Sequence, residues 1–520
     1  MHKQWPRFVT WLGMALVVAA PAAVSLLLVH SVLGAAIGNF VPATDDEMFY
    51  WREIDTFSAV NFRGGYYTYE EQPAAWTVSH FGAHGPLFPM LYGGLGELFG
   101  WHPNTVVFFN LLVVTAALAV LVVSIRPTLG QLGLFVVLLA TFWPLQWELP
   151  SLGQEALHLG FAILMAAVFF RLLRSPGRRP QWVTTAVVLS LLLASLFRPF
   201  WIALLLPYLI LNYHPGSARA WLAVLAASAA AVVGVFVTTV YISAPYPSFV
   251  RNLMVATAAS RRVGLRLLAS YALENTKQFL DWRGPLTFFN VNRYQLVLLL
   301  LALVLVIGLA LWQSRRAGQP WRAYLSQQSD QIFHLYNAGL ITLVVLALYI
   351  PTGYEGFRVF APYLLMTSVL LILSRRWVLV ALVLVSGLLQ APAFVHDYAI
   401  EKGRNFAYDP GQVSAFSASV GNLLDYDPHG SAWSNTLLLD GQLLCYQVRC
   451  DYLMAVPAGR GVSVIFFPDR LTAPLKSKYL LLSQAGYTLV QNRLGSKLHL
   501  QLLRTTPVGG LYLNLDCACP

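Results

Sequence analysis

The sequence predicts a polytopic α-helical membrane protein that ends in a small mixed α/β domain. Of its 520 residues, 57% are hydrophobic and only 11% are charged, and the mean hydropathy is +0.60. Soluble globular chains contain about 45–50% apolar and about 25% charged residues. The long apolar stretches end near residue 395. From about Ala399 the chain is rich in Asp, Gly, Asn and Pro between short runs typical of strands.

Eleven apolar stretches are long enough to cross a bilayer, whose hydrocarbon core is about 30 Å thick. They cover 8–33, 104–125, 129–147, 155–173, 182–197, 200–213, 219–243, 294–313, 331–350, 357–374 and 376–395. The first follows the basic segment Met1–Arg7, as in a signal peptide, but it is too long for a signal sequence and no small-residue cleavage site follows it cleanly. We interpret it as a retained span. Arg198, between the short fifth and sixth stretches, is expected to snorkel at a helix end.

Positive charge predicts the orientation of these spans. With the N-terminus in the cytoplasm, the inner segments hold thirteen Lys or Arg residues and one acid, Asp330. Every inner loop then carries a basic residue, as the positive-inside rule requires. All four cysteines fall outside, where disulfides are permitted, and Cys517 and Cys519 are expected to form a disulfide rather than a zinc site. The predicted location is the cytoplasmic membrane, with an extracytoplasmic C-terminal domain.

Three hydrophilic segments lie outside in this arrangement, at 34–103, 244–293 and 396–520. Residues 1–395 are therefore predicted to form the transmembrane domain and residues 396–520 the soluble domain. The strands of that domain are predicted in "NTLLLD", "GVSVIFF", "KYLLLS", "YTLVQN" and "KLHLQLL". The acids and histidine of "DYDPHG" (Asp425, Asp427 and His429) are expected in a solvated turn rather than a ligand site.

The first two outer loops have opposite charge. The first contains eight acids and two bases, and the second contains seven bases and two acids. Long loops cross the membrane during synthesis largely regardless of their charge, so the basic excess of the second loop does not by itself require a function. The alternative is an anion site at the outer leaflet, because arginine matches phosphate geometry. Arg261, Arg262 and Arg266 lie among helically spaced Leu, Val and Tyr residues, which predict an amphipathic helix or helix pair in the membrane interface.

Three adjacent carboxylates, Asp45, Asp46 and Glu47, follow the first span. With Thr44 they satisfy the S/T-x-x-E capping-box pattern, and acids are favoured in the first turn of a helix. They also stand beside the aromatic run "MFYW" at the predicted interface. A carboxylate partly shielded from water has a raised pKa and can take a proton from a hydroxyl. A helix cap and a general base are compatible roles for this triplet.

The same loop continues with "HGPLFPMLYGGLGELFGW", from His84 to Trp101. An acidic pair followed by such a stretch resembles the membrane glycosyltransferases of GT-C architecture, in particular the protein O-mannosyltransferase and aminoarabinose-transferase clan. A later segment, "GYEGFRVFAPYLLM", is similar to the start of a late span in that clan, with Arg358 as the matching basic residue. The resemblance covers about the first 110 residues well and the rest of the chain only by layout. Here the acidic pair is a triplet, and His84 stands where relatives often have lysine.

The resemblance implies that a sugar passes from a polyprenyl-phosphate carrier to an acceptor hydroxyl on the outer face, with inversion at the anomeric carbon. Asp46 would be the general base, with Asp45 next, and Glu47 would order the loop. The residues expected to contact donor phosphate or sugar are His80, His84, Arg261, Arg262, Arg266 and Arg358. His84 has an alternative role as a turn residue beside Gly85 and Pro86. The acceptor would be a glycan, a lipid or a protein.

A divalent metal is a further candidate ligand, because Asp45, Asp46 and His84 supply hard or borderline donor atoms, although no spacing in the loop is diagnostic. The pattern requires no cofactor. Membrane lipid is an expected partner. Nucleic acid is not, because the membrane topology accounts for where most of the positive charge lies.

Two other functions stay open, a transporter or flippase of a lipid-linked saccharide and a non-catalytic assembly protein with this fold. A transporter buries ionisable residues in the middle of its spans. Glu148, Glu155 and His158 instead cluster near the predicted outer ends of the third and fourth spans, which favours chemistry at the outer face.

Overall fold

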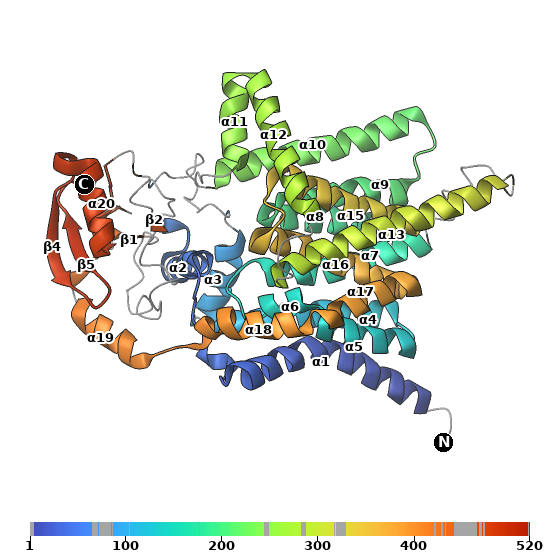
Figure 1. Ribbon diagram of the computed structural model, residues 1–520, viewed down its shortest axis with the longest axis horizontal. Helices are drawn as coiled ribbons and strands as arrows, with labels where there is room; N and C mark the ends of the chain where they lie inside the picture. The colour runs from blue at the N-terminus through green and yellow to red at the C-terminus, as the bar shows by residue number, and fades with distance from the viewer. Residues whose placement is uncertain are drawn as a thin grey trace.

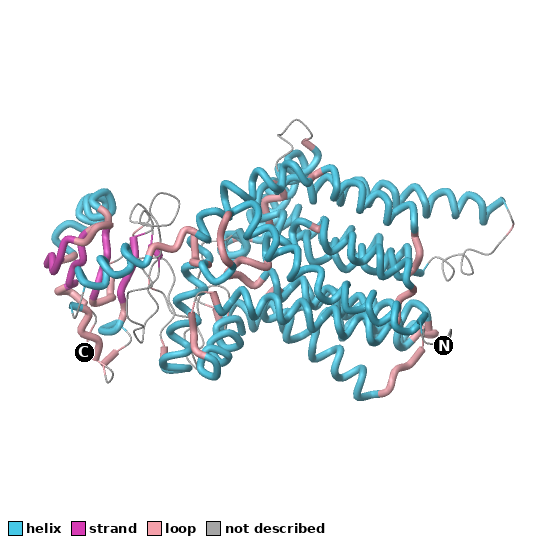
Figure 2. The backbone as a smooth tube through the Cα atoms, turned by 90° about the horizontal axis from the view of Figure 1, so that it is seen from below, coloured by secondary structure: helices cyan, strands magenta, loops and turns pink. Residues whose placement is uncertain are grey.

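The structure is a computed structural model, and it describes residues 5–64, 71, 85, 87–102, 104–175, 177–243, 249–281, 288–316, 318, 329–420, 423–427, 430–431, 433–440, 465–466, 471, 474–517 and 519. A helical bundle makes up most of it, with the strands beyond one end and the N-terminus at the other (Figures 1 and 2). We call the end nearer the strands the domain end of the bundle.

The bundle and its connections are built from helices of very different length. Bundle helices are α1 (Trp5–Leu33), α4 (Thr105–Ile125), α5 (Leu129–Thr141), α6 (Trp143–Glu148), α7 (Glu155–Arg174), α8 (Gln181–Phe197), η3 (Pro199–Leu204), α9 (Leu205–Tyr213), α10 (Ala218–Ile242), α13 (Phe288–Arg316), α15 (Ser329–Leu348), α16 (Gly353–Leu373), α17 (Trp377–Leu389) and α18 (Ala391–Glu401). The hydrophilic segments contain α2 (Asp45–Val60), α3 (Leu87–Phe99), α11 (Phe249–Ala259), α12 (Arg261–Leu280), η4 (Lys402–Phe406), α19 (Pro410–Val420) and α20 (Gln484–Leu494).

The predicted polytopic fold is confirmed, although some spans are shorter than expected. In the described part of the chain, seven helices are long and apolar enough to cross a membrane: α1, α4, α7, α10, α13, α15 and α16. The pair 377–389 and 391–406, bent by 48°, makes an eighth. The remaining three predicted spans coincide with the shorter apolar helices α5, α8 and η3–α9. The stretch 129–147 divides at Phe142, and Pro144 begins the first turn of α6.

Helix α16 is the centre of the bundle. Its apolar window is 94% buried, because α7, α13 and α15 all pack against it. By contrast, the windows of α10 and α13 are only 17% and 28% buried, so most of their apolar side chains face outward. Such surfaces are stable in lipid rather than in water. Tyr354 and Arg358, in the first turns of α16, line the cavity described below.

The C-terminal domain contains a mixed five-stranded sheet of order β2-β1-β3-β5-β4. Its strands are β1 (Leu437–Asp440), β2 (Ile465–Phe466), β3 (Tyr479–Leu482), β4 (Leu500–Thr505) and β5 (Gly510–Asn514). β1 pairs in parallel with β2 and β3, whereas β5 pairs antiparallel with β3 and β4. Four of the five strand predictions therefore correspond to observed strands.

The prediction that "YTLVQN" forms a strand was wrong, because these residues lie in α20. The buried residues Gly486, Val490 and Leu494 recur every four positions, which is helical spacing. The hydroxyl of Ser483 caps the helix by accepting the backbone N–H of Gly486 at 2.9 Å. The strand β5 was missed.

Cys517 and Cys519 are joined as a disulfide, as expected, and Cys445 and Cys450 lie outside the described residues. Asp425 and Asp427 are exposed in irregular backbone, and His429 lies outside the described residues.

The first hydrophilic segment and the C-terminal domain share one hydrophobic core. Residues of α2 and α3, such as Met48 and Phe88, belong to the same buried cluster as Leu438 and Leu480 of the sheet. Glu71 adds a polar link, because its carboxylate accepts the backbone N–H groups of residues 476 and 477 and the hydroxyl of Ser477. The domain is therefore anchored on the loop that carries the acidic triplet.

Candidate active site

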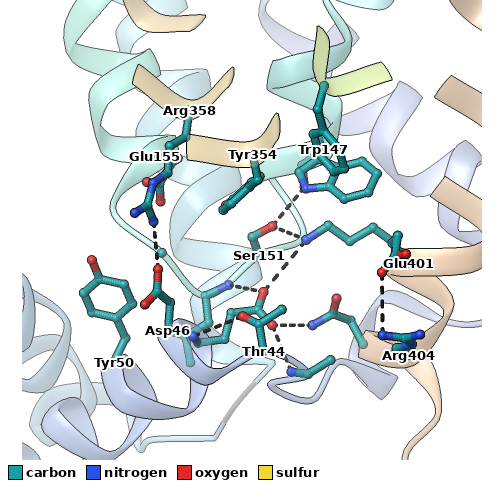
Figure 3. A pocket seen from close by; sticks show the side chains of 17 residues that line it. Thr44, Asp46, Tyr50, Trp147, Ser151, Glu155, Tyr354, Arg358, Glu401 and Arg404 are labelled. Carbon is teal, nitrogen blue, oxygen red and sulfur yellow. Dashed lines mark hydrogen bonds and ion pairs between the residues drawn. The ribbon is translucent and has the colours of Figure 1, made fainter. Parts of the chain in front are cut away.

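A cavity of about 310 Å³ is lined in part by the start of α2, a helix that Figure 1 shows between the strands and the bundle. Five parts of the chain line it: the start of α2, the α6–α7 connection, the start of α13, the start of α16 and the α18–η4 junction. Figure 3 shows acidic and basic side chains from these parts pointing toward one another. The cavity therefore brings together residues from the first loop, the middle of the bundle and the end of the last helix pair.

The first turn of α2 presents the acidic triplet. Thr44 is the N-cap, and its hydroxyl accepts the backbone N–H of Glu47 at 3.3 Å. In place of the reciprocal half of the predicted capping box, the Glu47 carboxylate accepts the backbone N–H of Ala43, not that of Thr44, at 2.9 Å. The helix begins here because Thr44 is a strong cap and acids favour the positive end of the helix dipole.

Glu47 joins α2 to two other walls of the cavity. Its carboxylate accepts the side-chain amide of Asn405 at 2.7 Å and the backbone N–H of Leu152 at 3.2 Å. The Nζ of Lys402 lies 3.8 Å from the same carboxylate and donates to the hydroxyl of Ser151. Both charged side chains are under 10% exposed. Glu47 therefore holds the start of α2 in one position.

Asp46 points the other way, into the cavity (Figure 3). Its Oδ2 lies 2.8 Å from Nη1 of Arg358 on α16. The Asp46 side chain is 40% exposed and that of Arg358 22%. The aspartate is thus held as a charged acceptor and is still within reach of a molecule in the cavity. Tyr50, one turn further along α2, also lines the cavity, and burial raises the pKa of its phenol well above the usual value.

A second ion pair supports this wall. Glu155, the first residue of α7, accepts Nη2 of Arg198 at 3.0 Å, and Nη1 of Arg198 donates to the backbone carbonyl of Arg358 at 2.9 Å. Arg198 was expected to snorkel at a helix end. It is instead largely buried, because the carboxylate of Glu155 and the carbonyl of Arg358 satisfy its guanidinium. Arg198 therefore links Glu155 to the residue that pairs with Asp46.

A further carboxyl group, that of Glu148, lies just behind the cavity wall. The Oε2 of Glu148, at the end of α6, accepts the hydroxyl of Tyr354 at 3.3 Å, and Tyr354 lines the cavity. Glu148 is 1% exposed. Burial, followed by the negative charge of Glu155, raises the pKa of Glu148 to about 8. Burial therefore favours the protonated form of this carboxyl group.

The structure brings only some of the predicted site residues together. Asp46, Glu47 and Arg358 line the cavity, and Asp45 is the first residue of α2. Arg261, Arg262 and Arg266 do not line it; they are exposed at the start of α12. His80 and His84 lie outside the described residues. In the described ranges no three His, Cys, Asp or Glu side chains form a group able to hold a metal ion.

Sequence reasoning missed Lys402, Asn405 and Tyr354. Lys402 and Asn405 lie in η4, at the end of the last helix pair, in a stretch that was predicted to belong to the soluble domain, and no motif marks them. Tyr354 lies four residues before Arg358, so both face the same side of α16. Tyr354 could therefore have been predicted from its spacing to Arg358. Nothing in the sequence pairs Lys402 with Glu47.

Comparison with known proteins gave one match of structure and none of sequence. No family model matches the chain, and no curated protein matches it. The crystal structure of ArnT from Cupriavidus metallidurans in the apo state is similar over 97% of this chain and 98% of that chain, with 13% sequence identity and a TM-score of 0.39. At this identity and TM-score the match supports no statement about the activity or the residues of this chain.

Proposed function

We propose that this chain is a membrane glycosyltransferase that moves a sugar from a polyprenyl-phosphate carrier to an acceptor hydroxyl on the outer face of the membrane. The observation that carries the proposal is the ion pair between Asp46 and Arg358 inside the cavity. It supports the proposal because a carboxylate, which can accept a proton, lies beside a guanidinium group, which suits a phosphate. The reaction requires both groups at one centre.

Asp46 acts as the general base. It accepts the proton of the acceptor hydroxyl while the acceptor oxygen bonds to the anomeric carbon. The bond from that carbon to the phosphate oxygen breaks, and its electron pair stays on the phosphate. Attack from the side opposite the phosphate inverts the anomeric centre. The rigid start of α2, tied by Glu47 to Asn405 and to the backbone of Leu152, keeps the base in place.

Arg358 stabilises the leaving phosphate. Before the donor binds, its guanidinium pairs with Asp46. A phosphate oxygen competes for the same planar donors and leaves the Asp46 carboxylate available to the acceptor. Arg404, which lines the cavity and is 44% exposed, supplies a second positive charge at the other end. Negative charge that develops on the phosphate is stabilised by cations fixed before the reaction.

The helix pair α11–α12 holds the lipid carrier near the membrane surface. It stands across the direction of α10 and α13 at the domain end (Figure 1). Arg261, Arg262 and Arg266 are exposed on α12 together with apolar side chains such as Leu265 and Leu273. Exposed apolar residues beside arginines suit the boundary between acyl chains and phosphate headgroups. These arginines attract the carrier phosphate without entering the cavity.

Sugar transfer from polyprenyl-phosphate donors in isolated membranes tests the proposal. Wild type is compared with Asp46→Asn and Asp45→Asn, using labelled sugars and native glycan, lipid or protein acceptors. Asn keeps the size and loses the proton acceptor, so Asp46→Asn should lower transfer by about 10²–10⁴-fold at equal expression. Glu97→Gln, an exposed acid on α3, is the matched control and should transfer as wild type does.

Two outcomes would contradict the proposal. If both Asn variants transfer as well as wild type, the carboxylates serve only to begin α2. If wild type consumes no donor, the chain is a transporter or an assembly protein. Transport of a lipid-linked saccharide in reconstituted vesicles then separates these two.

A further inference from the structure

The hydroxyl of Tyr354 connects the cavity to the buried carboxyl group of Glu148. From this contact we propose that Glu148 is a positioning residue, which aims the O–H of Tyr354 at an anionic oxygen of the ligand. The inference rests on the proposed function, in which that oxygen belongs to the phosphate of the lipid-linked donor. Tyr354 also lies below Arg358, whose Cζ is 5.5 Å from the ring centroid. The tyrosine is therefore next to the cation assigned to the phosphate.

Whether Tyr354 can donate a hydrogen bond to the ligand depends on whether Glu148 is protonated. An ionised carboxylate only accepts, so it takes the O–H of Tyr354 and leaves none for the ligand. A protonated carboxyl group donates its own O–H to the tyrosine oxygen. The O–H of Tyr354 is then free to turn toward the cavity. Protonated Glu148 thus converts Tyr354 from a committed donor into an available one.

The surroundings of Glu148 favour the protonated form. It is 1% exposed, and its Oε1 has no hydrogen-bond partner within the part of the chain that the structure describes. Two carboxylates face it, Glu155 from α7 and Glu47 from α2, against one cation, Lys402 from η4. Burial and Glu155 raise its pKa to about 8, whereas Lys402 and the Tyr354 hydroxyl act in the opposite direction. An unpaired oxygen in a dry site is costly for a charged carboxylate.

Glu148 does not itself touch a molecule in the cavity, because the cavity lining contains Tyr354 and Trp147 but not Glu148. Its effect on a ligand therefore passes through Tyr354. If Glu148 had only a structural role, replacing it would change the stability of the protein and nothing else. If Glu148 positions Tyr354, replacing it also changes how ligand binding depends on pH.

The first test needs no ligand. Infrared difference spectra of the purified, full-length protein follow the carbonyl stretch of protonated carboxylic acids during a pH titration. We expect a band that is lost with a midpoint near pH 8 in wild type and in the control Glu97→Gln, and that is missing in Glu148→Gln. The inference is overturned if Glu148→Gln keeps that band. A wild-type carboxyl band lost only at ordinary acidic pH would also overturn it.

The second test measures binding of a short-chain polyprenyl phosphate to the same protein. In wild type, affinity should fall by about tenfold as the pH rises past 8, because a hydrogen bond to a charged oxygen is lost. Glu148→Gln carries a neutral amide that still donates to Tyr354, so it should keep tight binding at alkaline pH. Tyr354→Phe should bind weakly at every pH.

The two tests separate failure of this inference from failure of the proposed function. If Glu148→Gln loses affinity at alkaline pH as wild type does, Glu148 does not position Tyr354, although the donor class stands. If wild type binds no polyprenyl phosphate, the proposed donor is wrong and so is the ligand assigned to Tyr354. The infrared titration then still decides whether Glu148 carries its proton.

Discussion

Asp46 and Arg358 are 312 positions apart in the chain, and their side chains meet at 2.8 Å. One belongs to the first turn of a loop helix and the other to the central helix of the bundle. The pair therefore joins α16, the buried central helix, to the acidic first loop. In the proposed reaction it is also the contact that the donor phosphate opens.

The buried pair Glu47–Lys402 should make a large contribution to stability. Removing one partner leaves the other charge buried, which costs about 3–5 kcal/mol of unfolding free energy. We expect Glu47→Gln and Lys402→Met each to lower thermal stability in detergent. The double variant should lose less than the sum of the two. Strict additivity would show that the two charges do not interact.

Glu71 should hold the C-terminal domain against the first loop. Its carboxylate is 1% exposed and accepts two backbone N–H groups and the Ser477 hydroxyl. Glu71→Ala should speed hydrogen exchange at Lys476 and Ser477, measured by mass spectrometry on the full-length protein. Exposed Glu97→Gln serves as the control. Unchanged exchange in Glu71→Ala would mean that the apolar core alone holds the domain.

Stability should depend on pH through Glu148. Its pKa is about 8 when folded, against an ordinary 4.5, so between these values the folded protein keeps a proton that the unfolded chain has lost. Unfolding free energy therefore falls as pH rises through this window and levels off above it. Glu148→Gln lacks this dependence. The melting temperature of wild type should fall relative to that of Glu148→Gln as the pH rises to about 8, and the offset between them should then stay constant. A difference that does not vary with pH would contradict this.

The arginines of α12 should affect donor capture rather than the chemical step. They are exposed and do not line the cavity. We expect the triple variant R261Q/R262Q/R266Q to raise KM for a membrane-bound donor several-fold and to leave kcat unchanged. Steady-state transfer in proteoliposomes measures both constants. A fall in kcat without a change in KM would place these side chains at the reacting phosphate.

Local patterns predicted the residue types of the site but not its contacts. Asp46, Glu47 and Arg358 were found from an acidic triplet at a span end and from a short resemblance. Their pairing needed tertiary structure, because residues 312 positions apart share no local pattern. Lys402 was missed because a single lysine after a span usually lies in water. The amide of Asn405 was missed for the same reason.

The fold was predicted where apolar length decides it. Long spans such as α4 and α7 appear as expected, because a bilayer permits few alternatives. The helix α20 was taken for a strand because a short apolar run does not distinguish the two periods. The break at Phe142 follows from Pro144. This proline was visible in the sequence, but the stretch 129–147 was interpreted as one span because of its length.

A double-mutant cycle on Asp46 and Arg358 tests the central claim most directly. Transfer by Asp46→Asn, Arg358→Gln and the double variant is measured with one donor, at matched expression. If the two side chains act as one unit, each single variant loses about 10²-fold or more, and the double variant is little worse than either. Losses that multiply would mean independent roles, and wild-type transfer by either single variant would remove the pair from the reaction.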